Sequence, residues 1–483
     1  MKTLHDLNAT GARGSTAASL LSEPSTAGYI SGILVCAAAA GMLASGHASW
    51  ALALTLVFTV AVTALVRPRF YRLVAFTSVF LAPFAAVTSA LQPAERDYFS
   101  YVAAFAMLLV LLSLAQSNAI PRTIGCLYLA YLTISGFTTV LFAGDAKGVT
   151  VLDYILTGFA IYILVHRADR TERRVLVGLL LAFGVIQSIL AVTQVLFGSP
   201  VFPEVLPVLA VSERNYFSYV WPGATRLVTQ GSGTFLHFNY LGGVLALCTP
   251  LAFGTWLAKV RSVPRLVVFI ILAAGLVATF SRGALLGVLV GVVLILLLDR
   301  SHSRRAMYVL GLCAAALGML LAANTFAQYY ETTQNVNIRV QTWQVAVNNA
   351  LERPSNLLFG YGFDHFHGDV LSSGIGGRTA TVESTIMAAL HSAYLQIALE
   401  FGVVGLVLFA LWLFSVARKG LFLRRSPTTV ALSGAAAGFL CHQALDNSMF
   451  NYAGVLFVVV MALMEVESET AEPILARDQV ATR

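Results

Sequence analysis

The chain has few charged residues for its length, and none of them form a long charged stretch. Only 11% of its 483 residues are Asp, Glu, Lys or Arg, whereas 58% are hydrophobic. Long apolar runs extend from about residue 29 to residue 465, and no segment between them is expected to fold as a separate soluble domain. This composition argues against a soluble enzyme with one membrane anchor and predicts an all-α polytopic membrane protein.

Cysteine is also scarce, and the formal net charge of +7 is not gathered into a nucleic-acid-binding patch. The five cysteines all fall inside predicted spans, and we interpret them as small apolar residues rather than as disulfides or metal ligands. They are Cys36, Cys126, Cys248, Cys313 and Cys441. The polar N-terminal residues lack the pattern and cleavage site of a typical signal peptide and are expected to form a cytoplasmic tail.

The apolar segments predict 12 to 14 transmembrane helices in a single domain over 29–465, between cytoplasmic tails at 1–28 and 466–483. The expected spans lie near 29–46, 48–66, 73–91, 99–115, 124–143, 149–166, 175–197, 239–258, 266–280, 284–298, 307–323, 392–416, 428–445 and 449–465. The count is a range because 29–66 and 428–465 contain short or Gly/Ala-rich segments.

The basic residues orient these spans in the membrane. With both termini in the cytoplasm, only eight of the 30 Lys and Arg residues lie on the opposite side or within the membrane, namely Arg96, Lys147, Arg214, Arg226, Arg282, Arg339, Arg353 and Arg378. This distribution obeys the positive-inside rule. Two extended segments, about 198–238 and 324–390, then lie outside the cytoplasm. The second contains short helices, and we expect the chemistry in these loops.

Arg282 is the only charge in the 33 residues from Leu266 to Leu298. One helix of that length would measure about 50 Å, whereas the hydrocarbon of a bilayer is roughly 30 Å thick. Basic residues flank the run on both sides, which places both ends on one side of the membrane. The pattern therefore predicts a hairpin of two short spans with Arg282 at its tip. An arginine at that depth is costly and is expected to have a function or a partner.

Other polar motifs are predicted on the same side as Arg282. Arg226 precedes a glycine-rich segment over 231–243, Arg339 lies near Trp343 in the second loop, and that loop ends at His391. Further polar residues of these segments are His237, Asn239, Tyr394 and Gln396. Three arginines and one histidine from separate segments can converge at one external site. Guanidinium groups match a pyrophosphate, while a neutral histidine takes up a proton.

These residues carry a resemblance to the O-antigen ligase and O-antigen polymerase superfamily, the WaaL-like and Wzy-like proteins of the bacterial envelope. The resemblance covers roughly residues 220–410 in motifs and the whole chain in topology. Its motifs are Arg226 with the Gly-Thr-Phe segment ending near Asn239, Ser281-Arg282-Gly283, Arg339 with Trp343, Leu358-Phe359-Gly360-Tyr361-Gly362, and His391-Ser392 followed by Gly402 and Gly405.

The resemblance implies a metal-independent, C-type membrane glycosyltransferase of the bacterial inner membrane with a periplasmic active site. It would move a glycan from undecaprenyl diphosphate to an acceptor sugar hydroxyl, with inversion at the anomeric carbon and with no cofactor. His391 would be the catalytic base, and Arg226, Arg282 and Arg339 would bind the diphosphate. The resemblance also suggests sugar or acceptor contacts for His237, Asn239, Trp343, Tyr394 and Gln396.

Simpler interpretations stand beside these roles for several residues. His237 is more typical of an ordinary polar residue at a helix start, and His442 with Asp446 suggests a local polar contact between the last two spans. Asp364, His365 and His367 contain ligand atoms without a well-formed metal spacing. We therefore expect no metal site.

The acceptor distinguishes three related functions. An O-antigen ligase transfers to lipid A-core, a Wzy-type polymerase extends O-antigen, capsule or exopolysaccharide repeat units, and a protein O-oligosaccharyltransferase modifies a protein hydroxyl. The spacing from His391-Ser392 to Gly402 and Gly405 favours the ligase slightly. A transporter or flippase of polyprenyl-linked glycans is the alternative from another class, and it predicts polar residues lining several spans.

Overall fold

The computed structural model describes residues 121–143, 146–197, 216–221, 224–235, 237–298, 354–362, 391–423 and 426–470, with some single positions elsewhere. The chain divides into two compact units, Met1–Val74 and Ala75–Arg483, and every element named below belongs to the second unit. The predicted spans 29–46, 48–66, 73–91, 99–115 and 307–323, and most of the loop 324–390, lie wholly or mainly outside the described residues.

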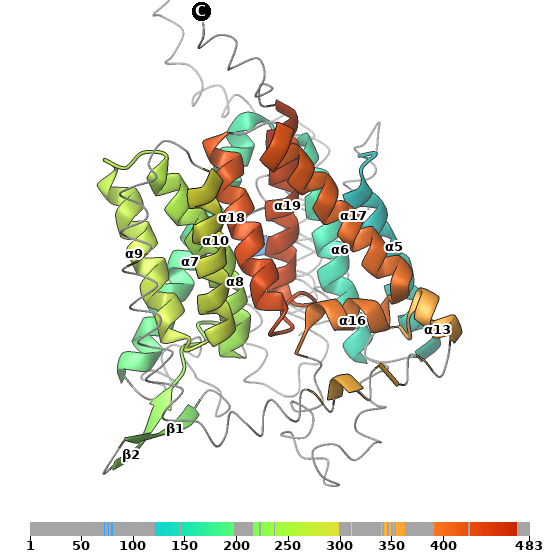
Figure 1. Ribbon diagram of the computed structural model, residues 1–483, viewed down its shortest axis with the longest axis horizontal. Coiled ribbons are helices and arrows are strands. Elements are labelled where there is room, and N and C mark those ends of the chain that lie inside the picture. Colours follow the sequence, from blue (N-terminus) through green and yellow to red (C-terminus); the bar gives the residue numbers. More distant parts are fainter. Residues whose placement is uncertain are drawn as a thin grey trace, which may run out of the picture. The chain divides into compact units, whose positions relative to one another are not determined.

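The described residues form a helical bundle with one small hairpin of strands (Figure 1). The helices are α5 (Ile124–Ala143), α6 (Ala146–Arg167), α7 (Arg170–Phe197), α8 (Phe238–Leu257), α9 (Val263–Ala278), α10 (Arg282–Leu298), α13 (Pro354–Phe359), α16 (Ala393–Glu400), α17 (Gly402–Ala417), α18 (Pro427–Gln443) and α19 (Tyr452–Thr470). A π-helical turn, η5 (Arg418–Leu423), continues α17. Strands β1 (Tyr216–Trp221) and β2 (Ala224–Thr229) pair antiparallel, an addition to the predicted all-α fold.

Three helices in the described part are long and apolar enough to cross a membrane: Arg170–Phe197, Phe238–Leu257 and Gly402–Gly420. Shorter apolar helices cover Ile124–Thr139, Val263–Ala278 and Arg282–Leu298. The helical architecture is therefore confirmed and is consistent with the predicted membrane protein, while the total of 12 to 14 spans stays a prediction.

The outward faces of the bundle are apolar. On α17, the exposed residues Val403, Val407, Leu411 and Phe414 recur at helical spacing along one face. The most apolar window of this helix is only 28% buried, whereas that of α8 is 83% buried. A row of exposed large apolar side chains is costly in water and suits contact with lipid. We therefore place α8 in the interior of the bundle and α17 at its lipid-facing periphery.

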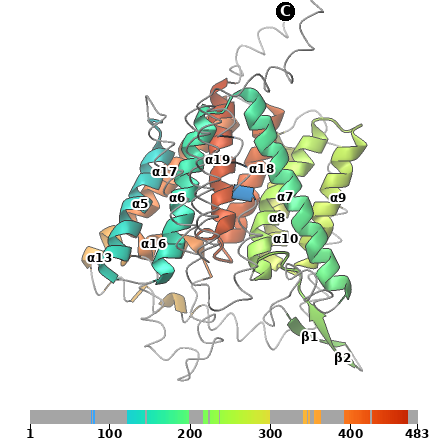
Figure 2. The ribbon, with the colours of Figure 1, turned by 180° about the vertical axis from the view of Figure 1, so that it is seen from behind.

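Helices α8, α10 and α18 are packed closely against one another, as Figures 1 and 2 show. Glycines on α10 permit the approach. A Cβ atom at Gly287 would lie 2.3 Å from the carbonyl oxygen of Gly438, and one at Gly291 would lie 2.4 Å from that of Gly434. Small residues spaced four apart let helix backbones touch where lipid supplies no hydrophobic drive for association. The relative position of α10 and α18 is therefore fixed by backbone contact.

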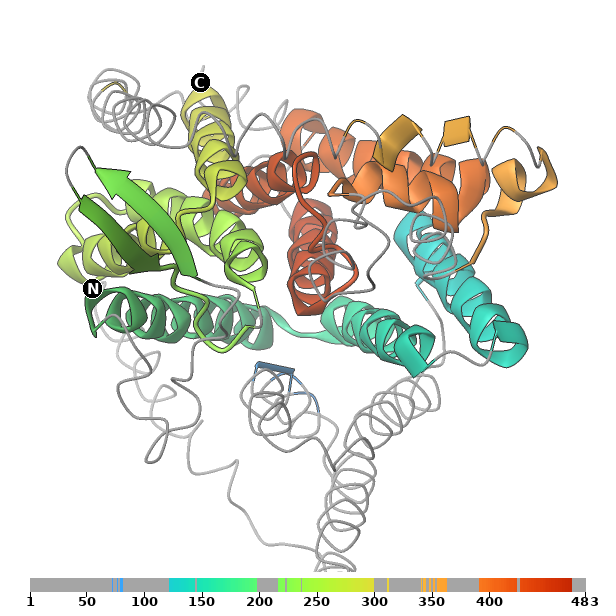
Figure 3. The same ribbon diagram turned by 90° about the horizontal axis from the view of Figure 1, so that it is seen from below.

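One end of this bundle carries the strand hairpin, and we call it the hairpin end (Figure 3). Helices α7, α9 and α18 finish there, while α8, α10 and α19 begin there (Figure 1). The Gly231 amide donates to the carbonyl of Ala278, which joins the segment after β2 to the end of α9. The segments that carry Arg226, His237 and Arg282 thus lie at one end of the bundle.

The opposite end is held by a buried polar cluster. The Tyr162 hydroxyl donates to the Glu465 carboxylate at 2.6 Å and lies 2.5 Å from the Thr123 hydroxyl. Nearby, Arg173 donates through Nε to the Glu467 carboxylate at 2.9 Å. These contacts join α6 and α7 to the last helix, α19. They fix the end of the bundle that lies away from the predicted site.

Candidate functional site

Arg282 is the first residue of α10, at the turn of a helical hairpin. Helices α9 and α10 are joined by only three residues, 279–281, as the apolar run of the sequence predicts. Phe280 takes a left-handed conformation with φ 54°, which reverses the chain, and the Ser281 carbonyl accepts from the Leu285 amide. The Arg282 side chain is half-buried. It therefore lies at the positive end of a helix dipole, where first-turn amides favour an anion.

The start of α8 lies against the start of α10. A Cβ atom at Gly242 would come within 3.0 Å of Ser281 and Ala284. His237 is the N-cap of α8, and its Nδ1 accepts from the Asn239 amide at 3.2 Å. The interpretation of His237 as a polar residue at a helix start agrees with this geometry. Its sugar-contact role stays a prediction.

Two buried glutamines of α7 hold the turn that leads into α8. Gln194 accepts from the amides of Ser232 and Gly233 at 2.9 Å each and donates to the Gly233 carbonyl at 2.9 Å. Gln187 accepts from the Thr234 amide at 2.9 Å and donates to the Thr234 hydroxyl at 2.8 Å. Both side chains are almost fully buried. We call this arrangement the glutamine clamp, and it fixes the backbone between β2 and α8.

The sequence interpretation did not include the glutamine clamp. Its pattern was visible, because Gln187 and Gln194 are polar residues seven positions apart on one face of the predicted span 175–197. Arg226 lies on β2 opposite Tyr219 in the strand register, so the clamp supports the segment that follows it.

His391 stands just before α16, the short helix that lies across the hairpin end (Figure 1). It is half-buried and adopts φ 47°, an unusual conformation for a residue other than glycine. The Tyr394 hydroxyl donates to the Leu440 carbonyl of α18 at 2.7 Å, and Gln396 donates to the Glu400 carboxylate at 2.8 Å. The Tyr394 bond attaches α16 to α18, whereas the Gln396 bond lies within α16 itself. Their contacts with sugars remain a prediction.

The predicted span 392–416 is broken into α16 and α17 at Phe401 and Gly402. Gly402 has φ 67°, and a Cβ atom there would lie 2.3 Å from the carbonyl oxygen of Leu358. The amides of Tyr361 and Gly362 donate to the carbonyls of Leu399 and Glu400 at 2.9 and 3.1 Å. The break therefore arises because residues 358–362 bond the last carbonyls of α16.

The contact between residues 358–362 and the end of α16 accounts for both the glycine motif and the break after α16. Gly360 and Gly362 of the Leu358–Gly362 motif have positive φ and lie against the end of α16. The Tyr131 hydroxyl of α5 donates to the Phe401 carbonyl at 2.8 Å and ties the same junction to the bundle. The Leu-Phe-Gly-Tyr-Gly segment thus orients the helix that follows His391.

The remaining candidates are placed less completely. Arg339 lies outside the described residues. Trp343 belongs to a short described stretch, 342–344, where it is helical and half-buried. The structure brings the starts of α8 and α10 and the end of α18 into contact, and it attaches α16 to α18 through Tyr394. Arg282, His237 and His391 therefore begin elements that meet at the hairpin end.

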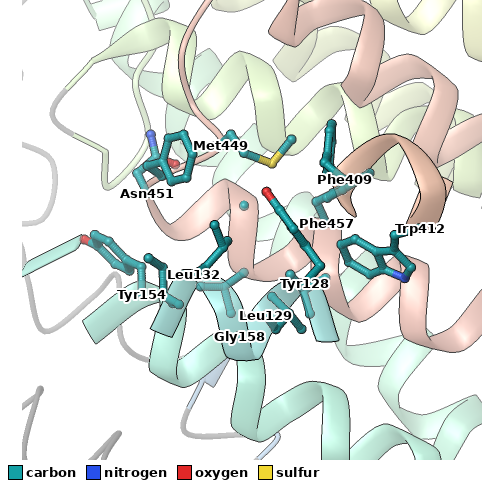
Figure 4. Close-up of a pocket in the computed structure, with 15 residues that line it drawn as sticks. Tyr128, Leu129, Leu132, Tyr154, Gly158, Phe409, Trp412, Met449, Asn451 and Phe457 are labelled. Carbon is teal, nitrogen blue, oxygen red and sulfur yellow. The ribbon is translucent and has the colours of Figure 1, made fainter. Parts of the chain in front are cut away.

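A separate apolar cavity lies between α5, α6, α17 and α19 (Figure 4). Tyr154 and Asn451 lie on one side of it, and Phe409 and Trp412 lie on the other. None of the site residues predicted from the sequence lines this cavity. It is therefore distinct from the polar groups described above.

Comparison with known proteins identifies part of the chain. Residues 267–410 match the protein-family model Wzy_C, described as O-antigen ligase. No curated protein matches the chain. The matched segment contains Arg282, Arg339, Trp343 and His391, whereas Arg226, His237 and Asn239 precede it. This match supports the resemblance to the O-antigen ligase and polymerase superfamily over residues 267–410.

Proposed function

We propose that this membrane protein transfers a glycan from undecaprenyl diphosphate to an acceptor sugar hydroxyl at the periplasmic face of the bacterial inner membrane. The observation that carries the proposal is the position of Arg282. It begins α10 beside the start of α8, within the segment that matches the O-antigen ligase family. The family match supports ligase or polymerase activity on lipid-linked glycans in general. The donor, the acceptor and the mechanism below are our proposal.

The chemistry is a single displacement at the anomeric carbon. The acceptor oxygen forms a bond to that carbon while the bond from the carbon to the diphosphate oxygen breaks, so the configuration inverts. His391, as a neutral imidazole, takes the proton of the acceptor hydroxyl. Undecaprenyl diphosphate leaves with the electron pair of the broken bond.

The leaving diphosphate gains negative charge, and cations that are already in place lower the barrier to its departure. Arg282 supplies a guanidinium group together with the first-turn amides of α10. Arg226 and Arg339 are proposed to complete the anion site. Such a site needs no metal ion, because the arginines carry the compensating charge.

The acceptor that we favour is lipid A-core, as in a ligase. The polar residues of α7 also disfavour a transporter, because Gln187 and Gln194 form hydrogen bonds with the turn before α8 instead of lining a transport path. A polymerase and a protein O-oligosaccharyltransferase share the donor chemistry and differ from a ligase in the acceptor.

The test reconstitutes the full chain in liposomes with an undecaprenyl diphosphate-linked glycan and a lipid A-core acceptor. Arg282→Ala and His391→Ala should each abolish transfer while the protein stays folded in the membrane. Arg261→Ala is the matched control, because Arg261 is exposed in the turn between α8 and α9 at the other end of the bundle. Transfer at the wild-type rate in both site variants would refute the proposal.

A deletion strain separates the acceptors. Loss of polymer from lipid A-core, with long chains still on the carrier, indicates a ligase. Single repeat units on the core indicate a polymerase, and unchanged lipopolysaccharide indicates a capsule or exopolysaccharide pathway.

A further inference from the structure

The imidazole of His442 is enclosed where three helices meet. It lies in the last turn of α18 and has no exposed surface. Glycines of the two neighbouring helices make room for it. A Cβ atom at Gly243 of α8 would lie 3.2 Å from its Cδ2, and one at Gly283 of α10 would lie 3.0 Å from its Nδ1. A Cβ atom at Gly287 would lie 3.4 Å from the His442 Cβ. The ring is thus held between the starts of α8 and α10.

The hydrogen bond of His442 defines the tautomer of the ring. Its Nε2 lies 3.1 Å from the carbonyl oxygen of Asn239. A carbonyl only accepts, so Nε2 carries the proton and donates, and in the neutral ring Nδ1 carries a lone pair. Within the part of the chain that the structure describes, Nδ1 is buried without a hydrogen bond of normal geometry. It faces Gly283, next to Arg282, in the electropositive first turn of α10.

The same turn of α18 also holds α16. The Leu440 carbonyl accepts from Tyr394, three residues after His391. One turn after His442 lies the buried carboxylate of Asp446, which accepts from the Asn447 amide at 2.6 Å. The sequence suggested a local contact between His442 and Asp446. The structure shows an electrostatic interaction between these two residues and, in addition, long-range contacts of His442 with α8 and α10.

We propose that His442 is a positioning residue for the diphosphate site. Its Nε2–H bond to Asn239 fixes the start of α8, and its ring fixes the start of α10, so Arg282 is held at a set distance from the α8 terminus. The inference rests on the proposed function, since it assumes that Arg282 binds the diphosphate. It adds a residue that lies outside the segment matched by the family model.

The test measures binding of farnesyl diphosphate, as a short isoprenoid diphosphate probe, to the full chain in nanodiscs by calorimetry. His442→Phe fills the space of the imidazole without a hydrogen-bond donor. It should weaken binding about tenfold, because the start of α8 loses its bond to α18 and Arg282 is no longer held in position. His442→Gln places an amide N–H near the position of Nε2 and should stay within about threefold of wild type. Ser433→Ala is the control, since Ser433 is a buried polar residue of α18 whose hydroxyl donates to the Thr429 carbonyl of its own helix.

Kinetics distinguish positioning from a general loss of structure. In the transfer assay, His442→Phe should raise KM for the lipid-linked donor while KM for the acceptor stays unchanged. If His442→Phe does not fold, His442→Asn replaces it, because the shorter amide does not reach the Asn239 carbonyl and the same loss is expected.

The outcomes separate the two proposals. Unchanged probe binding in Arg282→Ala refutes the diphosphate role of Arg282 and with it the proposed function. If Arg282→Ala loses binding, but folded His442→Phe and His442→Asn bind as wild type does, the inference about His442 is refuted and the proposed function stands.

Discussion

The glutamine clamp offers the sharpest test of how the site is supported. Gln194→Ala removes three hydrogen bonds at once, two from the Ser232 and Gly233 amides and one to the Gly233 carbonyl. These groups lie in a buried turn, with Ser232 only 1% exposed, so water does not readily replace the lost partners. A buried donor left without a partner costs about 1–3 kcal/mol. We therefore expect local opening of the turn to become easier by about 2–4 kcal/mol.

Hydrogen exchange read by mass spectrometry measures this change directly, because exchange of these amides reports the local opening free energy. A loss of about 2–4 kcal/mol lowers the protection of the amides over 231–234 roughly 30- to 700-fold. Peptides from α17, which packs against α5 and α16, should keep their protection. The transfer reaction should slow as well, since the same turn carries the chain from β2 into α8.

The matched control is Thr193→Ala on the same helix. The Thr193 hydroxyl donates to the Ile189 carbonyl of its own helix, whereas the turn is bonded by Gln187 and Gln194. Protection over 231–234 should stay at the wild-type level in this variant. If Gln194→Ala leaves protection of the turn within about threefold of wild type, the turn is held by other contacts and the reasoning is wrong.

Two further changes test the packing of the bundle. Gly287→Ala should separate α10 from α18, because its Cβ would lie 2.3 Å from the Gly438 carbonyl oxygen, and it should lower both thermal stability and transfer. Gly178→Ala on α7, where a Cβ meets nothing within 4 Å, should lower neither thermal stability nor transfer. An equal loss in the Gly287 and Gly178 variants would contradict the packing argument. Tyr162→Phe removes the donor to the buried Glu465 carboxylate and should cost about 1–3 kcal/mol of stability by denaturant titration. In a Glu465→Gln background, Tyr162→Phe should lower the free energy of unfolding by less than it does in the wild type. If the losses of the two single variants simply add in the double variant, the Tyr162–Glu465 hydrogen bond does not contribute to stability.

Much of the architecture follows from the sequence where length and charge act together. The apolar run around Arg282 is too long for one span and has its charge at the midpoint, so a hairpin was the simple solution. The structure places α9 and α10 within a few residues of that prediction. Where basic turns separate apolar segments, the end of α6, the start of α7 and the end of α8 lie within five residues of the prediction.

The parts that sequence reasoning missed depend on tertiary contacts or on an overlooked turn. The break at Gly402 is set by the carbonyl of Leu358, which lies far away in the chain. The partners of Gln194 are backbone amides, and these leave no mark in the side-chain pattern. The β-hairpin was different, since Pro222-Gly223 between two runs rich in aromatic and β-branched residues is a turn pattern that could have been recognised.

The lengths of α9 and α10 also bear on the free-energy cost of placing Arg282 in the membrane. The 16 residues of α9 and the 17 of α10 correspond to about 24 and 26 Å of helix, slightly less than the roughly 30 Å of bilayer hydrocarbon. If the start of α9 at Val263 and the end of α10 at Leu298 lie at the cytoplasmic boundary, Arg282 lies within a few ångströms of the outer boundary and not at the bilayer centre. A guanidinium group there is far less costly, because its stem reaches the interface. That depth is also where the diphosphate of a polyprenyl lipid lies while its chain stays in the membrane, so the same short helices that lower the cost of Arg282 place it where our proposal requires it.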